Sequence, residues 1–199
     1  MEENFGFEEH EFNEGLKQTL DRFKEMITSG KEYFFDVDQF EDLIDYFLDR
    51  GEFESSGEVL EHALKQHPFS NSIKIRLAQQ NFAGGRINNA LSILNQTEKI
   101  EPLNEDIILL KAEIFSQMRN HKKALQYYSK ALERATFNKV EIMIDMALEL
   151  EEMQRYGKAI EVLQDLIIID PENEIALHEI NHCFIMSEQP ENGVDFFVS

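Results

Sequence analysis

Apolar residues recur at intervals of three and four positions over most of this 199-residue chain. Leu16, Leu20 and Phe23 show this spacing within residues 13–28, where it predicts an amphipathic helix that ends at Gly30. The same spacing runs through the later segments, which are separated by glycine, proline or asparagine. No alternating apolar and polar stretch indicates a strand. The pattern therefore predicts an all-α protein.

A small residue near the start of a helix recurs with a fixed period. Its successive positions are 34, 34 and 35 residues apart, at Ser56, Ala90, Ala124 and Ala159. Prolines follow the same period: Pro68 and Pro102 are one period apart, and Pro102 and Pro171 are two periods apart. This self-similarity is typical of helical hairpins that are too small to bury their own apolar face and must stack on neighbouring hairpins.

The period divides residues 36–199 into four full hairpins and a partial fifth. The turns of the first three fall at Gly51, at Gly84 with Gly85, and at Asn120 with His121. The fifth hairpin opens at Glu174, and its second helix would begin at Asn192, shortly before the chain stops. We therefore expect the chain to be a fragment of a longer array.

The residues before the array have a different character. Residues 1–12 are rich in acidic residues and predict a loose tail, whereas residues 13–35 predict an N-terminal cap helix and a connector. The connector contains three consecutive aromatic residues, Tyr33, Phe34 and Phe35. Because such side chains are rarely left in water, we expect them to fold back onto the first hairpin.

The third hairpin resembles the tetratricopeptide repeat family. It has a small residue (Ala112) and an aromatic residue (Phe115) in its first helix, and small, aromatic and small residues in its second (Ala124, Tyr128 and Ala131). The fourth hairpin follows with Met143, Ala147, Leu150, Tyr156, Ala159 and Leu163. Small residues let two helices approach closely, and an aromatic ring fills the space beside them. The resemblance implies an α-solenoid, a right-handed superhelix of stacked helix-turn-helix hairpins.

The first two hairpins depart from this pattern. Ile44 replaces the small residue of the first helix, Ser56 replaces alanine, Asn81 stands where an aromatic residue is usual, and the chain has no tryptophan. These departures weaken the individual units but leave the period intact.

The charge of the chain restricts its partners. The sequence has 39 acidic and 19 basic residues, a net charge of −20. Such a field repels phosphate backbones and anionic lipids, so we expect neither nucleic acid nor a membrane surface as a partner. With one cysteine (Cys183), no secretory signal and no long apolar run, the sequence favours a cytoplasmic protein.

One motif suggests catalysis. His178-Glu179-Ile180-Asn181-His182 matches H-E-x-x-H, in which two histidines hold zinc and the glutamate activates water. A catalytic zinc needs a third protein ligand, and only Glu188, Glu191 and Asp195 follow in the chain. We therefore keep a zinc peptidase only as a remote alternative and expect no catalysis, no metal and no cofactor, apart from adventitious metal binding by His178, His182 and Cys183.

The remaining charged residues indicate no site. A basic cluster between residues 119 and 139 has the spacing of solvated helix faces and consists of Arg119, Lys122, Lys123, Lys130, Arg134 and Lys139.

The function that the resemblance implies is a binding scaffold for another protein. In the tetratricopeptide family the first helices of successive repeats line a concave groove that binds an extended peptide or a helix. By register, this groove would present Asp38, Glu41, Asp45, Asp49, Ile75, Gln79, Phe82, Leu109, Glu113, Ser116, Ile144 and Leu148. Its acidic rim and apolar floor favour a partner segment with basic and apolar residues.

The alternative function is structural, with repeats that stack from chain to chain. An unfinished last hairpin would leave Phe184, Phe196 and Phe197 partly uncovered, which predicts weak self-association through the C-terminal end.

Overall fold

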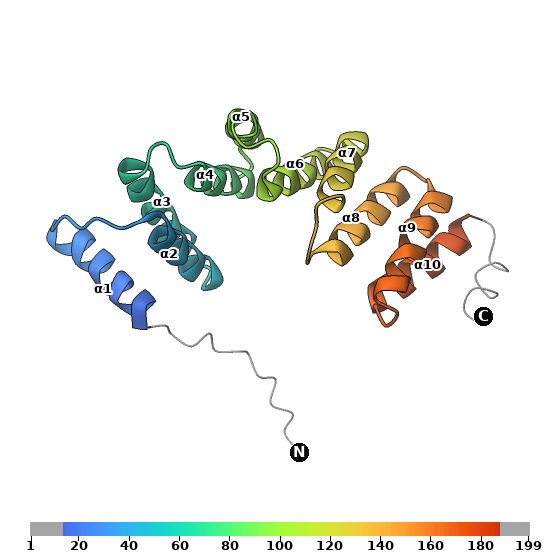
Figure 1. The fold of residues 1–199 in the computed structure, drawn as a ribbon, viewed down its shortest axis with the longest axis horizontal. Helices are drawn as coiled ribbons and strands as arrows, with labels where there is room; N and C mark the ends of the chain where they lie inside the picture. Colours follow the sequence, from blue (N-terminus) through green and yellow to red (C-terminus); the bar gives the residue numbers. More distant parts are fainter. Residues whose placement is uncertain (1–13, 188–199) are drawn as a thin grey trace, which may run out of the picture. The chain divides into compact units, whose positions relative to one another are not determined.

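The computed structural model describes residues 14–187 of the chain. All regular secondary structure in this range is α-helical, which confirms the predicted fold class (Figure 1). The helices are α1 (Glu14–Ser29), α2 (Val37–Asp49), α3 (Phe53–Gln66), α4 (Asn71–Ala83), α5 (Ile87–Thr97), α6 (Glu105–Gln117), α7 (His121–Leu132), α8 (Lys139–Glu152), α9 (Tyr156–Ile169) and α10 (Glu174–Met186). The acidic tail predicted for residues 1–12 and the second helix of the fifth hairpin lie outside the described residues.

The chain separates into two compact units between Gly84 and Gly85. In the described residues, unit 1 contains helices α1 to α4 and unit 2 contains α5 to α10. The boundary falls at the turn of the second hairpin, where two consecutive glycines separate α4 from α5.

Unit 1 is built around aromatic side chains. Phe35 and Phe40 are fully buried, and Phe23 and Phe47 are 3% and 7% exposed. The ring centroid of Phe35 lies 6.1 Å from that of Phe23 and 5.4 Å from that of Phe40. The rings therefore link α1, the connector and α2 in one core, to which Val59, Leu60 and Ala63 of α3 also belong.

The connector before α2 is held by the end of α3. Gln66 accepts a hydrogen bond from the Phe35 backbone and donates one to the Tyr33 carbonyl, at 3.0 and 2.9 Å. Asp36 then caps α2, with Gln39 completing a capping box. The expected return of the aromatic segment is confirmed for Phe35, which is buried; Phe34 contacts the His67 ring at 5.3 Å between centroids but remains 67% exposed.

Unit 2 is built around small side chains. Its helices pack as consecutive antiparallel neighbours from α6 to α10. Alanines that are 0% exposed lie at the helix contacts, namely Ala112, Ala124, Ala131, Ala147, Ala159 and Ala176. Because alanine has only a methyl group, the backbones can approach closely, and Tyr128, 4% exposed, fills the adjacent space. The expected packing of Ala124 and Tyr128 is confirmed.

The turns between paired helices repeat one backbone conformation. Gly51 and Gly85 have φ of 71° and 73°, and Arg119 and Gln154 have φ of 54° and 56° at the equivalent positions of the next two hairpins. These four residues are 34, 34 and 35 positions apart, the same period as the small helix residues. Glycine adopts this left-handed conformation easily, whereas arginine and glutamine hold it at some cost in strain.

The last described helix buries one face, whereas Ile175, Ile185 and Met186 on it are exposed. Phe184 on α10 is only 5% exposed, so the expectation that it would be partly uncovered was wrong. It packs in a core with Ile180 and Cys183 of the same helix and with Leu163 of α9. Phe196 and Phe197 lie outside the described residues.

Candidate binding surface

The predicted groove residues of unit 1 fall into an exposed, a half-buried and a buried group. Asp38 and Asp49 on α2 are exposed, whereas Glu41, Asp45, Gln79 and Phe82 are half-buried. Ile75 on α4 is only 4% exposed and belongs to the packed interior. We therefore exclude Ile75 from the open surface.

One of these acids already has a partner. The Asp45 carboxylate on α2 forms an ion pair with Arg76 on α4, with 2.8 Å between Asp45 Oδ2 and Arg76 Nη2. Both side chains remain partly in solvent, at 48% and 27% exposure. Asp45 is therefore partly neutralised by the chain itself, whereas Asp38, Glu41 and Asp49 form no ion pair with a described residue.

The predicted groove residues of unit 2 lie on α6 and α8. Glu113 is exposed, Leu148 is 41% exposed, and Leu109 and Ile144 are partly buried. Ser116 donates a hydrogen bond to Glu149, which joins α6 to α8. The first helices of these two hairpins are therefore connected at this point.

Two carboxylates are close enough for the charge of one to act on the other, Glu113 on α6 and Asp145 on α8. Burial and then the charge of Asp145 raise the pKa of Glu113 above its ordinary value, although part of the Glu113 side chain stays exposed. Burial also raises the pKa of Asp145, assisted by the charges of Glu149 and Glu141 and opposed by a hydrogen bond from Tyr128. We call Glu113 and Asp145 the carboxylate pair.

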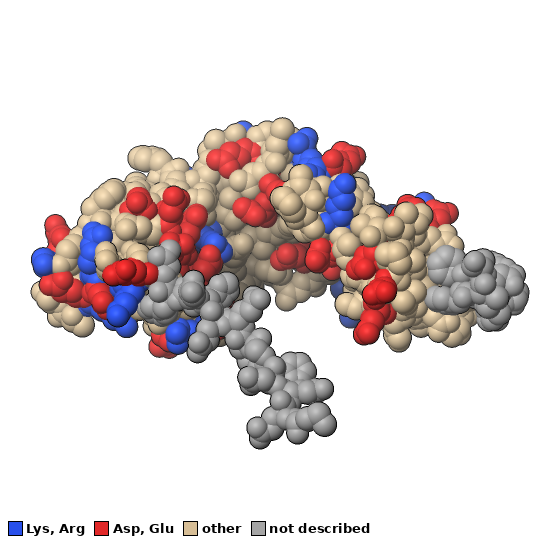
Figure 2. Space-filling view, turned by 60° about the horizontal axis from the view of Figure 1, so that its bottom comes forward, with Lys and Arg blue, Asp and Glu red and all other residues tan. Residues whose placement is uncertain are grey.

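The carboxylate pair lacks a counter-ion in the described part of the chain. Neither Glu113 nor Asp145 forms an ion pair with a described residue. Burial, followed by the charges of Asp145, Glu113 and Glu149, also raises the pKa of the neighbouring Tyr128. Figure 2 shows acidic side chains, in red, over the visible face of both units. Removing water from two like charges raises their energy, so a cation bound between the two carboxylates would stabilise them.

Another carboxylate on α8, Glu149, has a partner for each of its two oxygens. Its side chain is 8% exposed, one oxygen accepts from Ser116, and the other lies 2.7 Å from His121 Nδ1. Serine and histidine thus contact the same carboxylate. A nucleophilic relay would require the serine to contact the histidine, so this cluster is arranged to join α6, α7 and α8.

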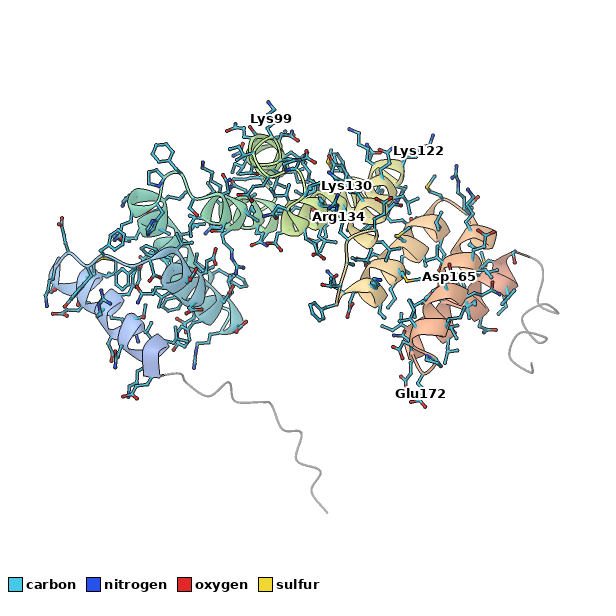
Figure 3. The ribbon with its side chains drawn as sticks, in the orientation of Figure 1. Lys99, Lys122, Lys130, Arg134, Asp165 and Glu172 are labelled. Atoms are coloured by element: carbon cyan, nitrogen blue, oxygen red, sulfur yellow. The ribbon has the colours of Figure 1, made fainter. Side chains whose placement is uncertain are left out.

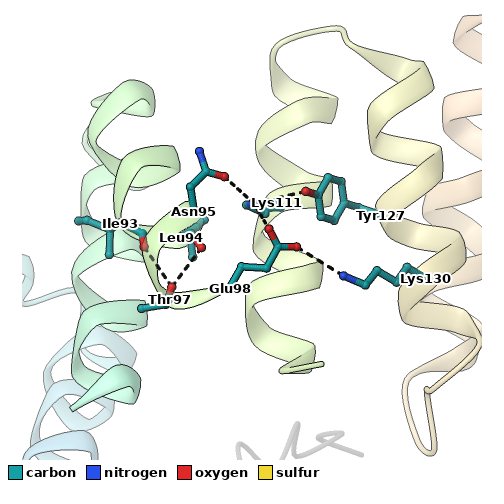
Figure 4. Close-up of polar contacts among 8 residues, drawn as sticks. All are labelled: Ile93, Leu94, Asn95, Thr97, Glu98, Lys111, Tyr127 and Lys130. Atoms are coloured by element: carbon teal, nitrogen blue, oxygen red, sulfur yellow. Dashed lines mark hydrogen bonds and ion pairs between the residues drawn. The ribbon is translucent and has the colours of Figure 1, made fainter. Parts of the chain in front are cut away.

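A buried lysine joins α5, α6 and α7 (Figure 4). The Lys111 side chain is 2% exposed, and its ammonium group lies 2.6 Å from both Asn95 Oδ1 and Glu98 Oε2 and 3.3 Å from the Tyr127 hydroxyl. Burial alone would raise the pKa of Glu98, but Lys111 and Lys130 together hold it below its ordinary value. The network is internal to unit 2 and leaves no open position for a ligand.

The basic cluster of residues 119–139 lies mainly in solvent, as expected. Arg119, Lys122, Lys123, Arg134 and Lys139 are exposed. Figure 3 shows Lys122 pointing away from α7. Lys130 is the exception, since it pairs with Glu98 at 3.4 Å.

The histidine motif lies on α10 but does not form a histidine pair. His178 is 77% exposed and contacts its neighbour Glu179 at 3.0 Å. His182 instead contacts Glu151 on α8 at 2.9 Å. Burial, followed by the charge of Glu151, raises the pKa of the Cys183 thiol to about 12, so the thiol is protonated at neutral pH. The three acids considered downstream, Glu188, Glu191 and Asp195, lie outside the described residues.

Asp145, Glu149 and Glu151 were not expected from the sequence, although a signal for Glu149 and Glu151 exists. Contacts between first helices of successive hairpins join residues 31 to 33 positions apart, as in Asp45 with Arg76, Ser116 with Glu149, and Glu151 with His182. This separation is slightly shorter than the repeat period. A search for complementary side chains at this separation would have found all three contacts.

None of the described helices has the length and apolar character that crossing a membrane requires.

Comparisons with known proteins agree with this architecture. Residues 105–138, which span α6 and α7, match the family model of the tetratricopeptide repeat. A search of curated proteins found no match.

Solved structures resemble the fold at low sequence identity. MamA (residues 41 to the end) from Desulfovibrio magneticus RS-1 has a TM-score of 0.67 and 14% identity over 80% of this chain and 89% of its own. Another MamA crystal structure has a TM-score of 0.66 and 17% identity over 83% and 92%. A tetratricopeptide repeat protein from Parabacteroides merdae ATCC 43184 has a TM-score of 0.63 and 18% identity over 80% and 65%. Residues 105–138 are thus a tetratricopeptide repeat, and the chain is a helical-repeat protein with the fold of the tetratricopeptide repeat proteins.

Proposed function

We propose that this chain is a non-enzymatic interaction scaffold whose α6–α8 surface binds a peptide or helix of another protein through a basic residue and adjacent apolar anchors. The carboxylate pair carries the proposal. Asp145 is half-buried and its charge acts on the more exposed Glu113; both have raised pKa values and no counter-ion among the described residues. A lysine or arginine of a partner would supply the missing charge.

Apolar positions adjoin the pair on the same helices. Leu109 precedes Glu113 by four residues and Leu148 follows Asp145 by three, so each leucine shares a helix face with its acid. Leu148 is 41% exposed and is available to a partner. An ammonium or guanidinium group flanked by apolar side chains fits this arrangement.

Unit 1 contributes a second acidic surface to the proposal. Asp38, Glu41 and Asp49 lie on α2, and Gln79 and Phe82 lie on α4. These residues belong to the first helices of the first two repeats, which repeat proteins commonly use for binding. They would act mainly by attracting a basic partner, because ion pairs in solvent contribute only about 0.2–1 kcal/mol each.

Peptide selection on the full chain tests the proposal. Peptides selected from a random library should be enriched in lysine or arginine next to leucine, isoleucine or phenylalanine. Combining Glu113→Gln with Asp145→Asn should weaken a selected peptide about tenfold, since two partly exposed ion pairs together contribute about 1.4 kcal/mol. Leu148→Ala should weaken the binding free energy of such a peptide by about 2 kcal/mol if the leucine is a buried anchor in the complex.

A matched control removes the same charge elsewhere in unit 2. Asp165→Asn with Glu172→Gln changes two exposed acids on α9 and the turn that follows it (Figure 3). This control should leave affinity within about twofold. Selected peptides without basic residues, or equal losses in both double variants, would show that the carboxylate pair is not the binding site.

A further inference from the structure

Three side chains able to bind a metal converge between α8 and α10. Glu151 on α8 and Glu179 and His182 on α10 each offer one atom, and these atoms all lie within 4.8 Å of one another. His182 Nδ1 is 2.9 Å from Glu151 Oε2 and 3.9 Å from Glu179 Oε2. Ligand atoms bound about 2.0–2.2 Å from a tetrahedral zinc ion lie about 3.4 Å apart. The two measured separations bracket that value.

Glu151 provides an independent observation. Its side chain is only 10% exposed, and its Oε1 atom is buried with no donor at full hydrogen-bond distance, although the weakly donating Cys183 thiol interacts with this carboxylate. Glu149, two residues earlier on the same helix, has partners for both oxygens. A buried carboxylate oxygen without a partner is costly, and a bound cation would compensate for it. The buried oxygen, Glu151 Oε1, belongs to the same carboxylate whose other oxygen contacts His182.

We infer that Glu151, Glu179 and His182 form a site for a divalent transition-metal ion, with Zn²⁺ the best match. One imidazole with two carboxylates suits zinc, whereas Mg²⁺ and Ca²⁺ prefer oxygen ligands alone. The Tyr156 ring on α9 packs edge-on against the His182 ring, with centroids 6.5 Å apart, and helps to orient it. Three protein ligands leave a fourth position for water or for a group of a partner.

This ligand set differs from that of a zinc peptidase with the same sequence motif. In H-E-x-x-H enzymes both histidines bind the metal and the glutamate acts as a base. Here Glu179 is a ligand, the third ligand comes from upstream, and His178 contacts Glu179 Oε1 on the solvent side. Our expectation of no metal considered only ligands downstream of the motif, whereas Glu151 lies 31 residues before His182.

Zinc titration of the full chain tests the inference. After treatment with a chelator and its removal, the protein should bind one Zn²⁺ per chain, measured by competition with a chromogenic zinc indicator. Loss of an outer-shell partner alone typically weakens metal binding 10–100-fold, so His182→Ala or Glu179→Gln should weaken it about 100-fold or more. Both residues are partly exposed, so these variants should fold. Mg²⁺ should not compete.

Glu174→Gln is the matched control. It removes an exposed carboxylate five residues before Glu179 on the same helix and should leave zinc affinity unchanged. Glu151→Gln should also weaken binding, with its helical content checked by circular dichroism. Uptake well below one zinc per chain, uptake insensitive to His182→Ala, or equal losses in Glu174→Gln and Glu179→Gln would each overturn the assignment.

Discussion

The two units of this chain reach similar hairpin packing with different side chains. Unit 1 fills its interior with phenylalanine rings, including Phe35 and Phe40 at 0% exposure. Unit 2 places fully buried alanines where its helices meet. An alanine contact fixes a short distance between two helices, whereas a large ring fills a wider space. The match to the family model falls in unit 2, because that pattern depends on small residues at fixed positions.

The units also differ in how they use charge. In unit 1 the ion pair between α2 and α4 is Asp45 with Arg76, and both side chains are partly in solvent. In unit 2 the ammonium group of Lys111 is buried against Glu98. The comparison indicates that unit 1 is stabilised chiefly by apolar volume, whereas unit 2 depends also on precise polar contacts and close helix spacing.

The largest expected effect concerns the aromatic core of unit 1. Phe40→Ala should reduce the free energy of unfolding by about 3–5 kcal/mol, because a fully buried ring is lost and a cavity remains. Urea denaturation followed by circular dichroism measures this. Phe69→Ala is the control, since its ring is 87% exposed and should change stability by less than about 0.5 kcal/mol. Equal effects of the two substitutions would contradict the assignment of the core.

Removing the charged partner of the buried lysine in unit 2 should reduce stability nearly as much. Glu98→Ala should cost about 3 kcal/mol, because it leaves the Lys111 ammonium with only Asn95 and Tyr127 as partners. Adding Lys111→Met should recover most of the loss, since the remaining buried charge is removed. Thermal denaturation of the single and double variants measures both changes. A double variant less stable than Glu98→Ala alone would argue against this account.

Close helix spacing in unit 2 can be tested at Ala124. Ala124→Leu should destabilise the protein by about 1–3 kcal/mol, because three extra carbon atoms must fit a contact with no exposed surface. Ser129→Leu, at an exposed position of the same helix, is the control for helix α7. A stability unchanged by Ala124→Leu would mean that α7 does not pack closely on its neighbours.

The sequence was sufficient for the helices, their turns and the small residues at their contacts. These features repeat, so each position is indicated several times, as for Ala90, Ala124 and Ala159. The binding surface was less predictable, because the burial of Ile75 and the pairing of Asp45 with Arg76 depend on contacts between hairpins. Lys111 was missed because lysine is rarely buried and its partners are supplied by α5 and α7.

The carboxylate pair of unit 2 predicts a stability that depends on pH. Because the pKa values of Glu113 and Asp145 are raised in the folded state, folding favours their protonated forms. Their charged forms therefore reduce stability as pH rises above the unfolded values of about 4. Glu113→Gln with Asp145→Asn should raise Tm at pH 7, and the gain should shrink near pH 4. A double variant less stable than the parent protein at pH 7 would mean that the chain already compensates both charges.

The smallest expected effect is at the exposed ion pair of unit 1. Asp45→Ala should cost only about 0.2–1 kcal/mol, because the side chains of Asp45 and Arg76 are 48% and 27% exposed and water already screens them. A double-mutant cycle with Arg76→Ala isolates their interaction, which should fall further in about 1 M salt, where the screening length is about 3 Å. The cycle for Glu98 and Lys111 is the reference, since Lys111 is shielded from solvent. If the Asp45–Arg76 interaction were as strong as that reference and insensitive to salt, unit 1 would depend on a desolvated polar contact as unit 2 does, and the contrast between the units would be lost.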